Sequence, residues 1–167
     1  MIKPPLPANE QDRLALLHAM LLLDTPPERR LDKIVDFASS EFAVPICLIS
    51  LVDSDRQWFK ARVGLSTCET PRDVSFCGHA LASDAILMVP DALLDPRFHD
   101  NPLVAGPPHI RFYAGAPLVC RDGLVIGTLC LIDTRPRTLD PVEQAILASL
   151  RDLALIELTT PRADDDA

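Results

Sequence analysis

Residues 110–132, IRFYAGAPLVCRDGLVIGTLCLI, decide the fold of this chain. Two apolar runs of strand length flank Asp122-Gly123, a dipeptide that is typical of tight hairpin turns. The sequence therefore predicts an antiparallel hairpin, with strands over residues 110–120 and 124–132. Because side chains alternate between the two faces of a strand, the register of this hairpin decides which residues lie together.

A two-residue turn would pair Gly115 with Cys130 and Pro117 with Thr128. One face of the hairpin is then apolar and is expected against helices: Ile110, Phe112, Ala114, Ala116, Leu118, Val125, Leu129 and Leu131. The other face mixes small and hydrogen-bonding residues, which suits either a small-molecule pocket or a solvent-facing surface: Arg111, Tyr113, Gly115, Pro117, Thr128 and Cys130. A three-residue turn would reverse this parity, and Pro117, which has no N–H, indicates an edge or a bulge.

Apolar periodicity and capping patterns place the remaining elements. Expected helices span residues 9–23, 26–44, 75–82 and 141–158, and expected further strands span residues 46–52, 57–63 and 86–89. Capping boxes with proline at the first helical position open two of the helices, at Thr25-Pro26-Pro27-Glu28 and Asp140-Pro141-Val142-Glu143. Strands joined by hairpins, with helices toward both ends, predict an α+β domain. We expect one domain over residues 9–159, with a loose lead-in at 1–8 and an acidic tail at 160–167.

Residues 91–109 form an unusually long irregular segment. It shows only a brief helical pattern at 92–94 and contains five proline and glycine residues. Long irregular segments in compact domains are usually either functional lids or disordered. Phe98, Leu103 and Val104 favour a lid that packs on the domain.

The composition excludes several classes of protein. With 167 residues, 48% hydrophobic and 24% charged, the chain has the size and content of one globular domain. Its net charge of −8 disfavours nucleic acid and anionic membranes as partners, because both attract lysine and arginine. There is no signal peptide and no apolar run of about 18 residues, and the cysteines lack CxxC spacing. We therefore expect a cytoplasmic protein with reduced thiols.

The first predicted helix carries two apolar stripes, Leu14, Leu17 and Leu21 on one and Leu16, Met20 and Leu23 on the other. One stripe suffices to dock a helix on a domain. The second stripe favours a homodimer through the terminal helices, since the last predicted helix is also apolar on more than one face.

Six segments together resemble a GAF domain, a small-molecule sensor module of bacterial signalling proteins. They are LLLDTPPERRLDKIVDFAS (21–39), ISLVDSDRQWFKARVGL (49–65), ETPRDVSFCGHAL (69–81), DPRFHDNPLV (95–104), IRFYAGAPL (110–118) and IGTLCLID (126–133). The chain is most similar to GAF modules that adjoin diguanylate cyclases and histidine kinases. The resemblance implies an antiparallel sheet of five or six strands, with the terminal helices on one face. It also implies a ligand pocket on the other face, under the short helix and the lid.

Ten residues are candidates for lining this pocket or its lid. They are Phe76, Cys77, His79, Asp91, Arg97, Phe98, Arg111, Tyr113, Thr128 and Trp58. Arg97 and Arg111 could clamp a carboxylate or phosphate, although Arg97 could instead anchor the lid through a neighbouring aspartate. Trp58 could stack on a ligand or fill the core, and Asp91 could simply cap a turn. No metal-ligand spacing recurs, so we expect no metal site.

Three hypotheses of function follow. The first is a non-catalytic sensor that binds an unidentified small molecule between sheet and lid and acts on a signalling partner. The second is a dimeric interaction module whose pocket is filled by its own side chains. The third is a thiol enzyme, because Cys77-Gly78 is similar to one cysteine motif of the free methionine-(R)-sulfoxide reductases. Those enzymes also need a cysteine at the start of the strand that is here IRFYAGAPL, which contains none.

Overall fold

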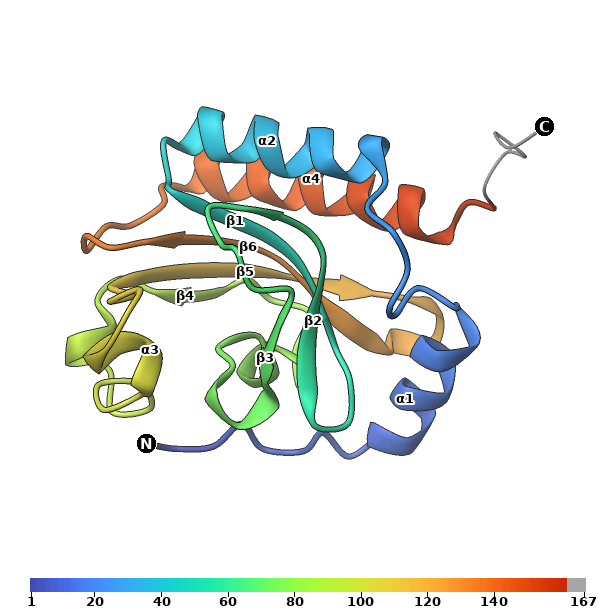
Figure 1. Cartoon of the computed structure of the whole chain (residues 1–167), viewed down its shortest axis with the longest axis horizontal. Coiled ribbons are helices and arrows are strands. Elements are labelled where there is room, and N and C mark those ends of the chain that lie inside the picture. Colours follow the sequence, from blue (N-terminus) through green and yellow to red (C-terminus); the bar gives the residue numbers. More distant parts are fainter. Residues whose placement is uncertain (162–167) are drawn as a thin grey trace.

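A computed structural model describes residues 1–161 of the chain. The expected acidic tail contains Asp164, Asp165 and Asp166, and these three residues lie outside the described residues. One six-stranded sheet has the order β3-β2-β1-β6-β5-β4, and each pair of neighbouring strands in it is antiparallel. Its strands are β1 (Ile46–Val52), β2 (Arg56–Val63), β3 (Glu69–Pro71), β4 (Leu87–Val89), β5 (Phe112–Val119) and β6 (Val125–Asp133). The predicted α+β fold with an antiparallel sheet is confirmed (Figure 1).

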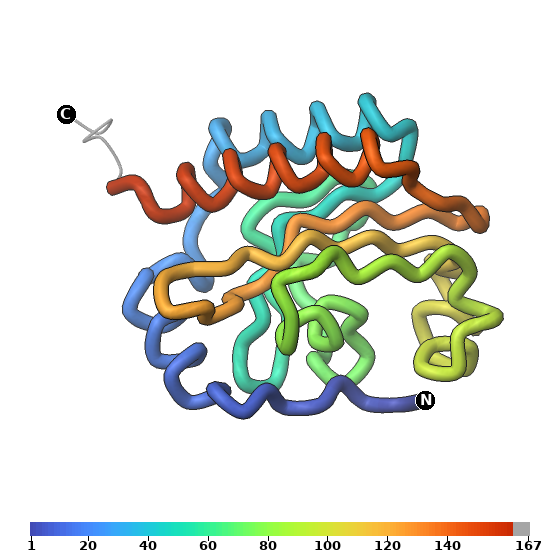
Figure 2. Tube along the Cα trace, turned by 180° about the vertical axis from the view of Figure 1, so that it is seen from behind, coloured from blue at the N-terminus to red at the C-terminus, as the bar shows by residue number. Residues whose placement is uncertain are grey.

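Helices α2 (Arg29–Phe42) and α4 (Pro141–Thr159) cover one face of this sheet, and short helical turns and loops cover the other (Figures 1 and 2). The α-helices are α1 (Glu10–Ala19), α2 (Arg29–Phe42), α3 (Pro102–Ala105) and α4 (Pro141–Thr159). The 3₁₀ turns are η1 (Arg72–Val74), η2 (Cys77–Ala80), η3 (Ala92–Leu94) and η4 (Arg121–Gly123). Strand β3 and helix α3 were not predicted, because three or four residues are too few to carry a periodicity.

The β5–β6 hairpin has the predicted strand pairs, although its turn is longer than predicted and β6 contains a bulge. Gly115 pairs with Cys130 and Pro117 with Thr128, as expected. The turn, however, has three residues, and the N–H of Cys120 donates to the carbonyl of Leu124 across it (2.7 Å). This would reverse the parity, but β6 carries one extra residue between the Pro117–Thr128 and Val119–Val125 pairs. The resulting bulge compensates for the longer turn, so both departures considered from the sequence occur and cancel.

Helices α2 and α4 lie side by side over one face of the sheet (Figure 1). Arg30 of α2 bonds to Glu157 of α4 across their junction (2.9 Å). The strand side chains buried beneath them include Phe112, Ala114, Ala116, Leu118, Ile126, Leu129 and Leu131. Two predictions for this face are wrong, because Ile110 and Val125 lie in the opposite cluster. Ile110 precedes the first residue of β5, and the bulge in β6 turns Ile126 rather than Val125 toward the helices.

The helix boundaries follow their caps to different degrees. The capping box at α4 is confirmed, with the N–H of Glu143 donating to Asp140 (2.8 Å) and the N–H of Asp140 donating to Glu143 (3.1 Å). The predicted box at Thr25 is wrong, because α2 begins only at Arg29 and the Thr25 hydroxyl instead accepts from the ammonium of Lys60 (2.6 Å). Helix α1 ends at Ala19 rather than residue 23, since Leu21 has a left-handed backbone (φ 55°).

Helix α1 does not join the helical layer but lies beyond one end of the sheet (Figures 1 and 2). Its Arg13 is completely buried and donates to the carbonyl of Val52 (2.7 Å). Glu10 pairs with Arg13 (3.0 Å) and also with Arg72 of η1 (3.0 Å). Burial alone would raise the pKa of Glu10, but hydrogen bonds and charge from Arg72 and Arg13 outweigh it and lower the pKa to about 2. This ion cluster fastens α1 to the turn between β1 and β2.

Replacing Glu10 with glutamine should leave two largely buried guanidinium groups without their counter-ion. We expect Glu10→Gln to lower the free energy of unfolding by about 2–3 kcal/mol at pH 7. Because the pKa of Glu10 is lowered in the folded state, its contribution is fully present above its unfolded pKa and is lost as the pH falls from about 5 toward 2. Urea unfolding at several pH values measures both effects. The exposed Asp12→Asn on the same helix is the control, and equal stability losses in the two variants would contradict the assignment.

Candidate functional site

A cavity of about 290 Å³ lies between the sheet and the lid, on the face away from α2 and α4. Strands β1, β2, β5 and β6 and turn η2 form its floor and one wall, and the lid and the segment after β2 close it. Its lining residues are Ile46, Leu48, Gln57, Phe59, Leu65, Thr67, Thr70, Phe76, Cys77, Leu103, Pro107, Pro108, Ile110, Tyr113 and Ile132. Leu103, Pro107 and Pro108 come from the segment that the sequence predicted as a lid. No side chain that lines the cavity belongs to a lysine, arginine, aspartate, glutamate or histidine.

Three of the predicted residues meet in a buried cluster at this cavity. The Cys77 sulfur accepts hydrogen bonds from the hydroxyl of Thr128 (3.1 Å) and from the phenol of Tyr113 (3.2 Å). Gly115 makes this geometry possible, because a Cβ at that position would lie 2.2 Å from the Tyr113 oxygen. Only glycine at residue 115 therefore lets the phenol lie across its own strand and reach the sulfur.

The cluster shifts the pKa values of two neighbouring thiols, Cys77 and Cys130, in opposite directions. A hydrogen bond with the Cys130 thiol is the main cause that lowers the pKa of Cys77, to about 6, against the opposing effect of burial. The hydroxyls of Thr128 and Tyr113 lower it further. The same hydrogen bond to Cys77, followed by burial, raises the pKa of Cys130 well above its ordinary value. Of the two thiols, Cys77 therefore loses its proton more readily than Cys130.

A chain of uncharged polar groups continues from the thiols toward the other edge of the sheet. The Ser50 hydroxyl donates to the side chain of Gln57 (3.1 Å), whose amide donates to Thr70 (2.6 Å). Ser50 also contributes to lowering the pKa of Cys77. Throughout residues 1–161, every buried side-chain nitrogen or oxygen has a hydrogen-bond partner. These hydrogen bonds were not predicted from the sequence, although the lone polar residue inside the apolar run ICLISLV (46–52) was a signal for Ser50.

Four predicted residues form the surroundings of the cavity rather than its walls. Phe98 is fully buried and stacks on Phe76, with ring centroids 4.1 Å apart. His79 contacts Phe98 edge-on (4.8 Å), and its Nε2 lies 3.2 Å from the carbonyl of Ile2. The remaining two are Arg97, which makes two hydrogen bonds to Asp95 (3.0 and 2.8 Å), and Asp91, which accepts from the N–H of Leu93 (3.1 Å). Arg97 thus bonds to the neighbouring aspartate within the lid itself, and Asp91 caps η3, so both side chains are engaged away from the cavity.

Two further candidates point elsewhere. Arg111 donates to the carbonyls of Val104 and Ile110 (both 3.0 Å) and so holds the lid on β5. Trp58 is buried in the cluster beneath the helices, so it cannot stack on a molecule in the cavity. The predicted lead-in also contacts this region, since the N–H of Ile2 donates to the carbonyl of Arg97 (3.4 Å).

Comparison with known proteins agrees with this architecture. The family model described as "GAF domain" matches residues 26–158. The chain belongs to the GAF-domain family. A Pseudomonas aeruginosa protein named as a cyclic di-GMP phosphodiesterase is 45% identical over 157 residues, which are 94% of this chain but 25% of that protein. The chain thus spans a quarter of the length of this relative.

Two solved structures share the fold at low sequence identity. The GAF domain of a phosphoenolpyruvate-protein phosphotransferase from Coxiella burnetii has a TM-score of 0.62 and 18% identity, covering 88% of this chain and 93% of that one. A free methionine-R-sulfoxide reductase from Neisseria meningitidis has a TM-score of 0.60 and 20% identity, covering 89% of each chain. Among residues 1–161 of this GAF domain, no helix is long and apolar enough to cross a membrane. Nor do these residues bring three or more histidine, cysteine or acidic side chains together as a metal site.

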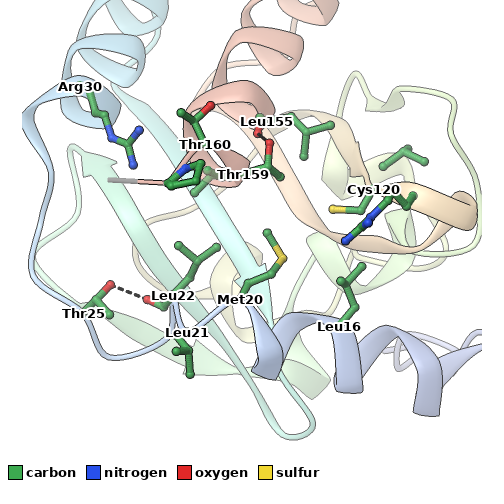
Figure 3. A pocket seen from close by; sticks show the side chains of 14 residues that line it. Leu16, Met20, Leu21, Leu22, Thr25, Arg30, Cys120, Leu155, Thr159 and Thr160 are labelled. Atoms are coloured by element: carbon green, nitrogen blue, oxygen red, sulfur yellow. Dashed lines mark hydrogen bonds between the residues drawn. The ribbon is translucent and has the colours of Figure 1, made fainter. Parts of the chain in front are cut away.

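The GAF domain has a larger and more open cavity, of about 770 Å³, at a different place. It lies between the end of α1, the β5–β6 hairpin and the end of α4 (Figure 3). Leu16 and Met20 of α1 and Leu155 of α4 give it apolar walls, and Thr159 and Thr160 lie on its rim (Figure 3). It contains none of the predicted site residues and lacks the enclosing lid, so the smaller cavity is the better candidate site.

Comparison of two of the three buried cysteines, Cys77 and Cys47, gives a direct test of the polarised thiol. One thiol should titrate near pH 6 in the folded protein, whereas burial raises the pKa of Cys47 to about 12. Thiolate absorbance between pH 5 and 8 should therefore disappear in Cys77→Ser and persist in Cys47→Ser. Tyr113→Phe should move the titration of Cys77 to higher pH, because it removes a donor to the thiolate. A titration near pH 6 that survives in Cys77→Ser would contradict the assignment.

Proposed function

We propose that this GAF domain is a non-catalytic sensor in bacterial signal transduction, and that its ligand occupies the cavity between sheet and lid. The observation that carries the proposal is this partly enclosed cavity, which a separate chain segment borders and which has the Cys77 cluster in its wall. Apolar walls with a few placed polar groups are typical of small-molecule sites. The relative named as a cyclic di-GMP phosphodiesterase supports a role beside an enzyme of that kind, acting on it as a regulatory module.

The cavity is well placed to influence the helical layer. On β6, Thr128 and Cys130 face the cavity cluster, whereas Leu129 and Leu131 pack beneath α2 and α4. A ligand that moves this strand would therefore move the apolar side chains against which both helices pack. It would change their arrangement only by the difference between its affinities for the two states.

Catalysis of the reductase type has less support. Segment 110–118 contains no cysteine, whereas the resemblance to that enzyme class requires one there. Cys77 and Cys130 are neighbours, but Cys130 keeps its proton and lies behind the cavity wall rather than in it. We therefore assign binding, not turnover, to the cavity.

Native mass spectrometry of freshly purified protein tests the sensor directly. Wild-type protein should retain a small molecule, and the lid variant Leu103→Trp should lose it because the larger ring fills the cavity. Leu94→Trp is the matched control, since Leu94 belongs to the same lid but is 82% exposed. The proposal is contradicted if the wild type retains nothing and no metabolite in a screen raises its melting temperature.

We further propose that the domain forms a homodimer through the outer surface of α2 and α4. The second stripe of α1 does not supply this surface, because Leu16, Met20 and Leu23 pack against the chain's own core. Large apolar side chains are instead exposed on α2 and α4: Phe37 (53%), Val142 (69%), Leu153 (44%) and Ile156 (58%). Exposed apolar groups that gather on one surface are typical of protein interfaces.

Sedimentation tests this dimer. Wild-type protein should sediment as a dimer at a protein concentration of roughly tens of micromolar. An interface of ordinary size reaches a dissociation constant below that concentration. The double variant Phe37→Glu with Ile156→Glu should be monomeric, while Leu94→Glu on the lid should remain dimeric. A monomeric wild type under these conditions would remove the proposed interface.

A further inference from the structure

The walls of the lid cavity define what kind of molecule it can hold. All fifteen lining residues are uncharged by type, and most are aliphatic or aromatic. A charged group that enters such a site loses its hydration without gaining an ion pair, which is costly.

The nearby cations are engaged outside the cavity. Arg97 is paired with Asp95, and Arg111 donates to two carbonyls of the lid. The buried guanidinium of Arg72 is paired with Glu10, and the buried ammonium of Lys60 is paired with Glu28 (2.8 Å). Recruiting any of them to a phosphate or carboxylate would break an existing ion pair or lid contact.

The polar groups that reach the cavity already have partners. Gln57 accepts from Ser50 and donates to Thr70, and the sulfur of Cys77 accepts two hydroxyl hydrogen bonds. The polar groups of the cavity therefore do not need hydrogen bonds from a highly polar ligand. Its volume of about 290 Å³ corresponds to roughly ten water molecules, and so to a ligand of about ten non-hydrogen atoms.

We infer that the sensor takes an uncharged, mainly apolar small molecule, such as a simple aromatic or short-chain alcohol, and excludes nucleotides and other anions. This rests on the proposed sensor function and makes it specific. It also means that a cyclic dinucleotide, which carries two phosphates and is far larger than ten atoms, would not be the ligand of this cavity. Any such molecule would be handled elsewhere in a longer protein.

Three probes of nearly equal size and shape, which differ in charge, show how the charge of a ligand affects its binding. They are phenethyl alcohol, phenylacetate and phenethylamine, which are neutral, anionic and cationic at pH 7. Binding is measured by titration of backbone NMR signals with the wild-type chain, after bound molecules have been removed by dialysis. The alcohol should perturb the amides of β1, β6 and the lid, and each charged probe should bind at least about tenfold more weakly.

The lid variants locate the binding. Leu103→Trp should weaken binding of phenethyl alcohol at least about tenfold, because its ring takes the ligand's volume, whereas the exposed Leu94→Trp should leave it unchanged. Far-UV circular dichroism checks that both variants fold. The selectivity among the three probes in the wild type tests the inference independently of either variant.

Two outcomes would overturn the inference. One is that phenylacetate or phenethylamine binds at this cavity as tightly as the alcohol does. The other is that the alcohol does not bind the wild type at all. Either result leaves the sensor function standing if native mass spectrometry finds a retained molecule that Leu103→Trp loses. The proposed sensor function is contradicted only if no molecule is retained and no metabolite stabilises the protein.

Discussion

The pairing of β6 with β1 on one side and β5 on the other is the constraint on which the rest of the structure depends. Every residue of β6 is buried, so each of its side chains must be matched to one of two interiors. Leu129 and Leu131 enter the apolar layer beneath α2 and α4, while Thr128 and Cys130 enter the layer that holds the cavity. A slip of one residue would exchange these sets and place hydroxyl and thiol groups under the helices. The bulge in β6 prevents this slip despite the three-residue turn.

Charge is distributed so that the cavity side remains neutral. The buried cations are held at the periphery, where Arg13 and Arg72 share Glu10, and Lys60 pairs with Glu28. Inside, hydrogen bonds between uncharged groups run from Thr70 through Gln57 to Ser50. The low dielectric of such an interior strengthens satisfied hydrogen bonds and penalises unpaired charges. The same arrangement therefore stabilises the fold and selects against charged ligands.

Much of the fold could be predicted because it depends on local patterns. The apolar alternation of the hairpin gave the pairs at Gly115 and Pro117, and the Asp140 box gave the start of α4. The errors arise where tertiary contacts override local signals. Thr25 is drawn to the ammonium of Lys60 instead of capping α2, and α1 is held beyond the sheet by the ions around Arg13.

The candidate site could be predicted only in part, for a similar reason. Cys77, Tyr113 and Phe76 were expected from the face of the hairpin and the resemblance, and they do lie at the cavity. The side chains of β1 were missed because a continuous apolar run such as ICLISLV does not reveal which face each residue takes. Arg97 and Arg111 have the chemistry of an anion clamp, but only tertiary structure shows that the lid itself uses both.

The proposed site requires an apolar space between this sheet and its lid. Xenon enters apolar cavities without needing a hydrogen bond or a charge, so a crystal of the protein pressurised with xenon shows whether this space exists. We expect a xenon atom within van der Waals contact of Leu48, Ile110 and Ile132, and none at that position in Leu103→Trp. An empty map there, with the side chains of the lid collapsed onto β1 and β6, would contradict it.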